Sequence, residues 1–198
     1  MRISIFDYGA GNLHSLMKAL QIGGHDVRIE TEIPAAIRSD ALVLPGVGGF
    51  GAAAARIAPS TDTLRAALAD GLPCLGICLG MQLLFDSSEE GAGAGIGAIP
   101  GRVRRLRAPR VPQIGWNGVH TAADPLFDET PQLVAYYAHS FVADAADTAD
   151  EIGWTEYAGD RFAAAVRRGH IWGVQFHPEK SAAAGLRVIR NFLAQAAA

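Results

Sequence analysis

The chain has 198 residues, which is long enough to bury the core of a globular domain. Hydrophobic residues make up 49% and charged residues 19%, which excludes a disordered chain, and a formal net charge of −3 gives no sign of nucleic-acid or membrane-surface binding. No stretch reaches the roughly 20 apolar residues of a membrane span, and the N-terminal apolar run is too short for a signal peptide, so a cytoplasmic protein is expected.

The first half of the chain alternates short apolar runs with segments of helical periodicity, which is typical of a parallel sheet with helices on its faces. Strands are expected at Arg2–Phe6, Val27–Glu30, Ala41–Leu44 and Cys74–Ile77. Helices are expected after Asn12, a candidate N-cap, after Thr61, and over Leu79–Phe85.

The second half predicts an added antiparallel region followed by a C-terminal helix at Ala182–Ala196. Its strands are expected at Ala98–Leu106, Val119–His120, Leu133–Phe141, Glu151–Tyr157, Arg161–Val166 and Ile171–Phe176. The glycine-rich stretch Ser87–Gly97 is interpreted as a surface loop. Because no linker is long enough to separate domains, residues 1–198 are expected to form a single domain.

Cys78 is the candidate nucleophile, at the centre of Gly76-Ile77-Cys78-Leu79-Gly80. G-x-Cys-x-G between a strand and a helix is typical of a nucleophile elbow, in which small neighbours permit a strained central backbone. The amides that begin the helix would favour the thiolate, and Leu79 N–H would donate into an oxyanion hole. Cys74 is interpreted as a buried structural thiol, and by local pattern alone Cys78 could equally be one.

His177 is the candidate base, because it ends an apolar strand at the same sheet edge where Cys78 is expected. Glu179 is the candidate acceptor that orients the imidazole ring. Taken singly, His177 could be a capping or core histidine and Glu179 a solvated charge. Together with the cysteine elbow, they predict a Cys-His-Glu triad.

A glycine-rich segment, Pro45-Gly46-Val47-Gly48-Gly49-Phe50-Gly51, follows the third expected strand. Glycines at a strand end let amides point at a reacting oxygen, so a second oxyanion donor is expected from Val47 or Gly48. A phosphate nest is the alternative, although no Walker lysine and no G-x-G-x-x-G pattern is present.

A run of arginines is interpreted as a solvated strand face rather than a phosphate site: Arg102, Arg104, Arg105, Arg107 and Arg110.

Together these segments resemble the class I (triad) glutamine amidotransferases, in which a glycine-rich oxyanion strand, a G-x-C-x-G elbow and a late H-P-E triplet occur in this order. Within that family, the chain is similar to the glutaminase subunits of imidazole glycerol phosphate synthases at Asp7 to Leu13, Leu44 to Gly48, Gly76 to Phe85, Gly115-Trp116-Asn117 and Gly173 to Ser181. The resemblance implies an α/β, flavodoxin-like fold with a central, mostly parallel sheet flanked by helices. It also implies hydrolysis of glutamine to glutamate and ammonia through a cysteine thioester, without a metal or another cofactor.

The resemblance also implies roles by position. Gln82 would face the bound glutamine, and the backbone of His139, Ser140 and Phe141 would hold its α-carboxylate and amine. The implied partner is a cyclase subunit, a (β/α)₈ barrel, in a heterodimer that makes imidazole glycerol phosphate and AICAR in histidine biosynthesis. Residues expected to lie toward this partner are Asn12, Trp116 and Lys180. Gln113 stands where many family members have histidine, which affects the expected interface but not the triad.

Other functions remain open at this stage. The chain could serve anthranilate or aminodeoxychorismate synthase, whose partners bind chorismate and are not barrels. It could be a degenerate amidotransferase with a scaffolding role, although the intact Cys78, His177 and Glu179 weigh against this. It could also be a cysteine hydrolase of γ-glutamyl conjugates, and activity on such conjugates without a partner would favour that reading.

Overall fold

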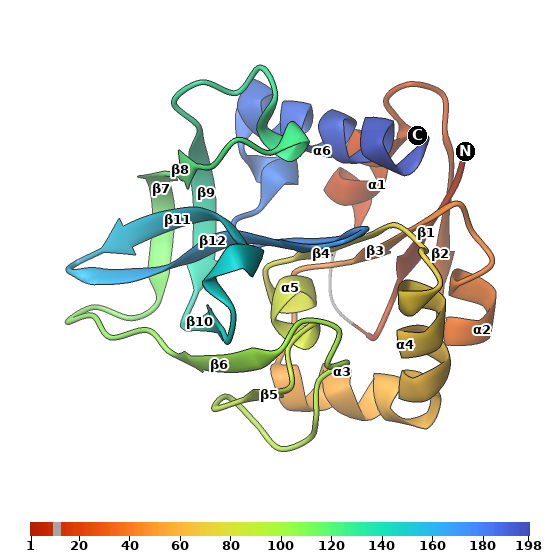
Figure 1. Ribbon diagram of the computed structural model, residues 1–198, viewed down its shortest axis with the longest axis horizontal. Helices are drawn as coiled ribbons and strands as arrows, with labels where there is room; N and C mark the ends of the chain where they lie inside the picture. Colours follow the sequence, from red (N-terminus) through yellow and green to blue (C-terminus); the bar gives the residue numbers. More distant parts are fainter. Residues whose placement is uncertain (10–12) are drawn as a thin grey trace.

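The computed structural model describes residues 1–9 and 13–198. Its largest element is an eight-stranded sheet with the order β2-β1-β3-β4-β13-β12-β11-β8 (Figure 1). The parallel strands are β1 (Arg2–Phe6), β2 (Asp26–Glu30), β3 (Ala41–Leu44), β4 (Cys74–Ile77) and β13 (Ile171–Val174). The antiparallel strands are β8 (His120–Thr121), β11 (Glu151–Tyr157) and β12 (Asp160–Arg168). The predicted mostly parallel sheet with an antiparallel addition is confirmed.

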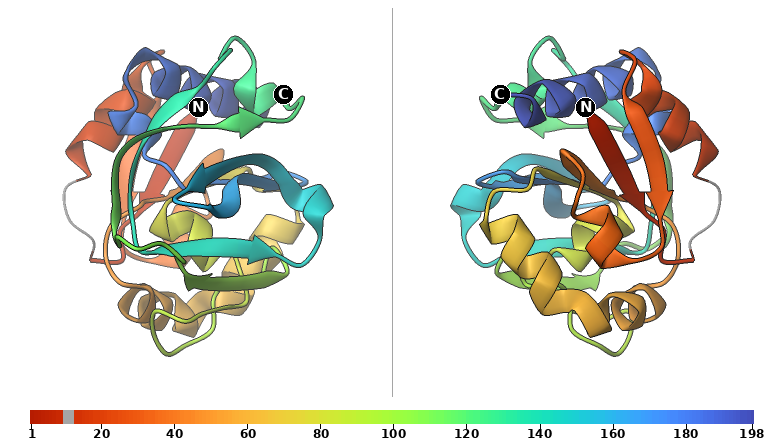
Figure 2. Two further views of the ribbon diagram at one scale, coloured as in Figure 1. Left: turned by 90° about the vertical axis from the view of Figure 1, so that its left-hand side faces the viewer. Right: turned by 90° about the vertical axis from the view of Figure 1, so that its right-hand side faces the viewer.

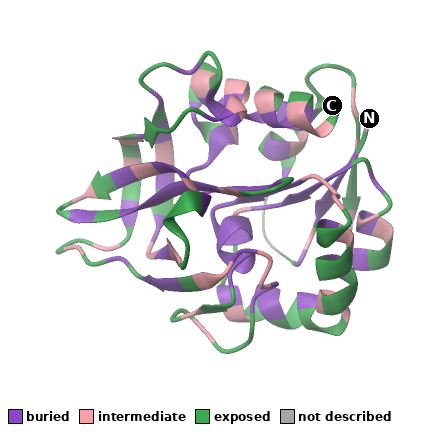
Figure 3. Ribbon diagram, in the orientation of Figure 1, coloured by how far each residue is buried: buried purple, intermediate pink, exposed green. Residues whose placement is uncertain are grey.

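Helices cover both faces of this sheet (Figure 2). One face carries α1 (His14–Gln21) and α6 (Ala182–Ala196). The other carries α2 (Ile33–Ala36), α3 (Phe50–Ile57), α4 (Thr61–Ala69) and α5 (Leu79–Leu83). Apolar side chains between each helical layer and the sheet form two clusters of buried residues, so the central strands β3, β4 and β13 are buried on both faces (Figure 3). Short 3₁₀ turns lie at η1 (Ala58–Ser60), η2 (Pro125–Phe127), η3 (Thr148–Asp150) and η4 (Pro178–Lys180).

Two small sheets adjoin the antiparallel end of the large one. The first has the order β10-β6-β5, with bounds β5 (Ser87–Ser88), β6 (Gly101–Arg105) and β10 (Phe141–Ala145). The second pairs β7 (Gln113–Gly118) with β9 (Val134–His139), at the left of Figure 1. The chain passes from β9 to β10 through Ser140, so the segment predicted to hold glutamine lies where these two sheets meet.

The hairpin turn between β11 and β12 has positive φ at both central residues, although only one of them is glycine. In the turn between β11 and β12, Ala158 has φ +52° and Gly159 has φ +87°, as a two-residue hairpin requires. The predicted strand at Leu133–Phe141 is in fact β9 together with the first residue of β10. Helix α1 begins at His14 with Leu13 in the N-cap position, and the expected cap Asn12 lies outside the described residues.

Among the described residues, the elements absent from the sequence-based prediction include α2, α3, β5, β7 and all of β10 after its first residue. Helix α3 starts inside the glycine-rich segment, at Phe50, and continues through an alanine run. Its buried residues are Phe50, Ala53, Ala54 and Ile57, which is helical spacing. The stretch Ser87–Gly97 is also more than a surface loop, because it contains β5 and the fully buried Ile96.

Candidate active site

Cys78 lies between β4 and α5 in a strained backbone conformation, with φ +48° and ψ −104°. The two glycines that flank it leave no room for side chains. A Cβ on Gly76 would lie 2.6 Å from the carbonyl oxygen of Gly80, and a Cβ on Gly80 would lie 2.0 Å from that of Leu44. The geometry therefore has the features predicted for a nucleophile elbow. Cys74, four residues earlier, is fully buried inside β4, as expected of a structural thiol.

His177 and Glu179 lie next to this elbow, and both side chains are almost fully buried. The ring nitrogen Nδ1 of His177 lies 3.0 Å from Oε1 of Glu179, which leaves the other ring nitrogen for Cys78. Main-chain hydrogen bonds fix the two reactive residues. Cys78 N–H donates to Val174 O at 2.7 Å, and His177 N–H donates to Tyr136 O at 2.8 Å. The structure thus brings together the three residues predicted to form the triad.

The protonation of His177 is set by competing effects. Burial alone would lower the pKa of the ring. Hydrogen bonds to Cys78 and Glu179, together with the electrostatic influence of both, outweigh burial and raise the pKa of His177 to about 9. Near neutral pH the ring is therefore protonated and positioned to give a proton to a leaving group.

Gly46 fills the narrow space beside the nucleophile and the base. A Cβ at this position would lie 3.0 Å from Cys78 Cβ, 3.0 Å from His177 Cε1 and 2.9 Å from Ile77 O. We expect Gly46→Ala to push these groups apart and to lower kcat for glutamine hydrolysis by about tenfold to a hundredfold. The matched control is Gly49→Ala in the same loop, where a Cβ meets no heavy atom within 4 Å. Equal losses of kcat in both variants would contradict this steric explanation.

A cavity of about 340 Å³ opens in front of the sulfur. Its lining includes every residue predicted for the oxyanion hole and for glutamine binding: Val47, Gly48, Leu79, Gln82, His139, Ser140 and Phe141. Gly48 has φ +117°, a conformation that favours glycine and that helps to turn this loop toward the cavity. Lining residues that the sequence did not single out are Glu90, Pro112, Ile114 and Ala138.

The carbonyl oxygen of Phe141 connects several polar groups of the cavity wall. It lies 2.9 Å from Gln82 Nε2 and 3.0 Å from His139 Nδ1. A carbonyl can only accept hydrogen bonds, so both nitrogens donate to it. Gln82 Nε2 also donates to Gln175 Oε1 at 3.1 Å, which leaves the side-chain oxygen of Gln82 as the group it can offer to a ligand. Gln113 is buried at 2% exposure against His139, so it lies inside the protein rather than on an outer surface.

Gln175 is a polar site residue that the sequence analysis missed. It was counted as part of an apolar strand, but its Nε2 lies 3.4 Å from Cys78 Sγ. A single polar residue in a run of apolar ones, just before His177, was the available signal.

His139 gives the protein a predictable sensitivity to acid. Burial lowers the pKa of its ring from 6.5 to about 4, partly offset by the hydrogen bond to Phe141. Below pH 6.5 the unfolded chain therefore binds a proton that the folded protein takes up only near pH 4. The free energy of unfolding should fall by about 3 kcal/mol from this residue as the pH drops through that window.

Denaturant unfolding at a series of pH values measures this contribution. In His139→Asn, whose amide can still donate to Phe141 O, the slope between pH 6.5 and pH 4 should flatten. The exposed Gln21 provides the control, since Gln21→Asn exchanges one amide for another, adds or removes no titrating group, and should leave the slope unchanged. An unaltered slope in His139→Asn would contradict the assignment.

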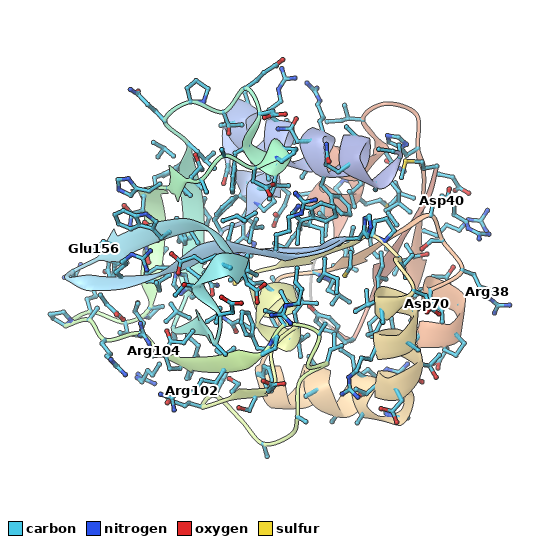
Figure 4. The ribbon with its side chains drawn as sticks, viewed as in Figure 1. Arg38, Asp40, Asp70, Arg102, Arg104 and Glu156 are labelled. Carbon is cyan, nitrogen blue, oxygen red and sulfur yellow. The ribbon has the colours of Figure 1, made fainter. Side chains whose placement is uncertain are left out.

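The arginine run is only partly the solvated face that was predicted. Arg102, Arg105, Arg107 and Arg110 are exposed. Arg104 is instead buried and ion-paired with Asp160 at 2.7 Å and with Asp144 at 2.9 Å. Figure 4 labels Arg102 and Arg104, which are two residues apart on β6 and therefore lie on the same face of the strand, although only Arg102 is exposed. Arg104 thus joins β6 to β10 and β12 and is not available to a phosphate.

An exposed apolar surface adjoins the cavity mouth on the β7–β9 sheet. Ile114 is 67% exposed, Trp116 56% and Val134 47%. Trp116 packs edge-on against Tyr136, and the ammonium of Lys180 lies 6.0 Å from the centre of the Tyr136 ring. We call Ile114, Trp116, Val134 and Tyr136 the ribbon patch. Of the three residues predicted to face a partner, Trp116 and Lys180 lie at this surface, and Asn12 falls outside the described part of the chain.

In residues 1–9 and 13–198, no cluster of three or more His, Cys, Asp or Glu side chains could hold a metal ion. None of the helices in the same residues has the length and apolar character needed to cross a membrane.

Comparison with known proteins identifies similar sequences and folds. The family model described as glutamine amidotransferase class-I matches residues 4–196. The imidazole glycerol phosphate synthase subunit HisH of Gloeobacter violaceus is 42% identical over 203 residues, covering 98% of this chain and 90% of that protein. HisH of Halobacterium salinarum is 42% identical over 201 residues, covering 96% and 92%.

Solved structures share the fold at much lower identity. A crystal structure of a glutamine amidotransferase has a TM-score of 0.79 and 16% identity, covering 99% of each chain. A chain of the PurLQS structure from Thermotoga maritima has a TM-score of 0.77 and 18% identity, covering 98% of each chain. At such identities these two similarities establish the fold alone.

Proposed function

The chain belongs to the class I glutamine amidotransferases, and from this premise we propose that it is the glutaminase subunit of an imidazole glycerol phosphate synthase. Residues 1–198 act as one glutamine amidotransferase domain. The observation that carries the proposal is the Cys78-His177-Glu179 arrangement at the end of a cavity large enough for an amino acid. A cytoplasmic location is supported by the two free cysteines.

Hydrolysis starts with attack of the Cys78 thiolate on the side-chain amide carbon of glutamine. The oxygen of the tetrahedral intermediate becomes an anion, which the N–H of Leu79 and an N–H of the Val47–Gly48 loop stabilise. Protonated His177 gives its proton to the leaving nitrogen, so that ammonia departs and a thioester remains. Neutral His177 then takes a proton from water, which attacks the thioester and releases glutamate and the thiolate. Glu179 holds the ring throughout these steps.

The rest of the cavity suits the remaining groups of glutamine. Glu90 supplies a carboxylate among the lining residues, and one of its oxygens already accepts from Phe50 N–H at 3.0 Å. Its other oxygen is available to the α-ammonium group. His139, Ser140 and Phe141 also line the cavity, and their backbone would hold the α-carboxylate and amine. Gln82 offers its side-chain oxygen, since its nitrogen is already engaged.

The ammonia requires a partner, because free ammonia in neutral water is mostly protonated and no longer nucleophilic. HisH relatives are named as subunits of a synthase, which implies a cyclase subunit. We propose that this cyclase is a (β/α)₈ barrel, that the two form a heterodimer, and that the barrel docks over the ribbon patch and Lys180. The cyclase would use the ammonia to form imidazole glycerol phosphate and AICAR.

Reconstitution tests the function. The chain mixed with the cyclase and its phosphorylated acceptor should convert glutamine to glutamate in step with the formation of imidazole glycerol phosphate. Mixing it with the chorismate-binding subunit of anthranilate synthase is the matched alternative and should give no glutamine-dependent product. Product formation only with the chorismate-binding subunit, or hydrolysis of γ-glutamyl conjugates without any partner, would refute the proposal.

Trp116 offers a direct test of the docking surface. Large exposed aromatic residues at the centre of an interface contribute strongly to affinity, so Trp116→Ala should raise the Kd for the cyclase by about tenfold to a hundredfold. The exposed Ile29 on the distant edge strand β2 is the control, since Ile29→Ala should leave the Kd unchanged. The Kd is measured by titration calorimetry, and an unchanged value in Trp116→Ala would show that the cyclase binds another surface.

A further inference from the structure

Gln175 is a fully buried amide that follows β13 and precedes the candidate base by two residues. Its main-chain N–H donates to Ala164 O at 2.9 Å, so the sheet holds its backbone independently of its side chain. Its side-chain oxygen accepts from Gln82 Nε2 at 3.1 Å, and its side-chain nitrogen lies 3.4 Å from Cys78 Sγ. Burying an amide without hydrogen-bond partners is costly, and here the partners are groups of the active site.

The orientation of the Gln175 amide follows from a chain of donors and acceptors. The series starts at Phe141 O, which can only accept, so the group of Gln82 that faces it is the side-chain N–H₂. The same nitrogen faces Gln175, so Gln175 must present its oxygen there. The N–H₂ of Gln175 is then the end that points at the sulfur of Cys78. A flipped amide would place two donors against each other and an oxygen against the sulfur.

We propose that Gln175 is a further catalytic residue, whose side-chain N–H donates to the sulfur of Cys78 and stabilises it as the thiolate. The proposal rests on the role of Cys78 as the nucleophile of the proposed function. A hydrogen bond from a neutral donor strengthens when its acceptor is charged, so this contact favours the anion over the thiol. A carbonyl that could accept a proton from the thiol, Ala138 O, lies 4.0 Å from the sulfur, so it favours the thiol only weakly.

The same contact would act twice in the reaction. Before attack, Gln175 holds the sulfur in place from the side of β13, while His177 lies at the following turn. When water breaks the thioester, the sulfur leaves as an anion and meets the same donor again. Gln82 connects this donor to the cavity wall, because its nitrogen bridges Phe141 O and Gln175 Oε1.

Alkylation of Cys78 by iodoacetamide tests the proposal in the free chain, without glutamine or a partner. The background is Cys74→Ala, which leaves Cys78 as the only thiol of the sequence. In Gln175→Glu, which keeps the shape and removes the donor, the pH midpoint of the alkylation rate should rise by about one unit. Gln175→Leu removes the amide without adding a charge and should shift the midpoint in the same direction. With the cyclase present, both variants should lose about tenfold in kcat for glutamine and little in KM.

The matched control is Gln21→Glu on the exposed end of α1, which makes the same chemical change away from the site. The pH midpoint of its alkylation rate should equal that of the Cys74→Ala background. Circular dichroism and thermal melting establish that each variant is folded before its midpoint is compared. An unchanged midpoint in folded Gln175→Glu and Gln175→Leu would overturn the proposal.

A measurement on the unmodified side chain decides the question if neither variant folds. In protein labelled with ¹⁵N-glutamine, the side-chain N–H₂ signals of Gln175 should titrate with the midpoint found by alkylation and should shift when Cys78 is alkylated. If the Gln175 signals change neither with pH at that midpoint nor on alkylation of Cys78, the proposal is overturned. Because these readouts do not involve glutamine hydrolysis, a failure of the proposed substrate or partner would leave them intact and would be recognised separately.

Discussion

Cys78→Ala should abolish glutamine-dependent synthesis of imidazole glycerol phosphate by the complex while ammonium salts continue to support it. Without the sulfur no thioester forms, and the loss in kcat should be about 10⁴-fold to 10⁶-fold, the range found when a nucleophile is removed from a catalytic triad. Ammonia supplied from solution bypasses the glutaminase site, so the cyclase reaction needs only a docked subunit. Parallel assays with glutamine and with ammonium salts measure both quantities.

The second cysteine provides the control for this experiment. Cys74 is fully buried in β4 and takes no part in the proposed chemistry, so Cys74→Ala should keep its glutamine-dependent kcat and lose only some stability. Mass spectrometry of the protein mixed with glutamine should detect a glutamyl adduct in this variant and none in Cys78→Ala. Glutamine-dependent turnover that survives in Cys78→Ala would remove Cys78 from the nucleophile role.

His177→Asn should slow thioester formation by about 10²-fold to 10⁴-fold, the usual contribution of a positioned acid. In the unmodified protein the pKa of His177 is raised to about 9, so the ring carries the proton that the leaving ammonia needs below that pH. The rate of thioester formation should therefore fall as the pH rises through about 9. In His177→Asn this fall should disappear, because the titrating group is gone.

Rapid-quench measurements of the thioester from about pH 6 to about pH 10 give the two profiles. Glu179→Gln serves as a graded comparison, since Nδ1 of His177 would lose a charged acceptor at 3.0 Å while the ring stays in place. Its profile should keep the fall but shift it to lower pH, because Glu179 contributes to the raised pKa of His177. Identical profiles for the unmodified protein and His177→Asn would exclude His177 as the acid.

Much of this site could be predicted because its parts are local in sequence. Close contacts with other atoms explain why glycine occupies the positions around Cys78. These glycines can be read directly from the sequence. His177 and Glu179 are two residues apart, so a hydrogen bond between them needs no knowledge of the fold. The strand ends could be placed because parallel strands bring their C-terminal ends to one sheet edge, as β4 and β13 do through the Gly76–Gly173 register.

What escaped prediction depends on partners distant in sequence. Gln175 contacts Cys78 and Gln82, which lie nearly half the chain away, so its strand position alone gave no reason to separate it from its apolar neighbours. Arg104 was assigned to a solvated face because its partners, Asp144 and Asp160, belong to other strands. Helix α3 was missed for a different reason: its first residues lie in a glycine-rich segment that dominated the local pattern.

The main-chain hydrogen bonds of Cys78 and His177 also couple the loss of activity to the unfolding of the sheet. The N–H of Cys78 donates to Val174 O, at the end of β13, and the N–H of His177 donates to Tyr136 O in β9. The N–H of Tyr136 in turn donates to Ser181 Oγ at 2.8 Å. Neither reactive residue therefore belongs to a loop that can open alone. Their amide protons should exchange with solvent as slowly as those of the central strands, and heat should destroy catalysis and the folded sheet in a single cooperative step.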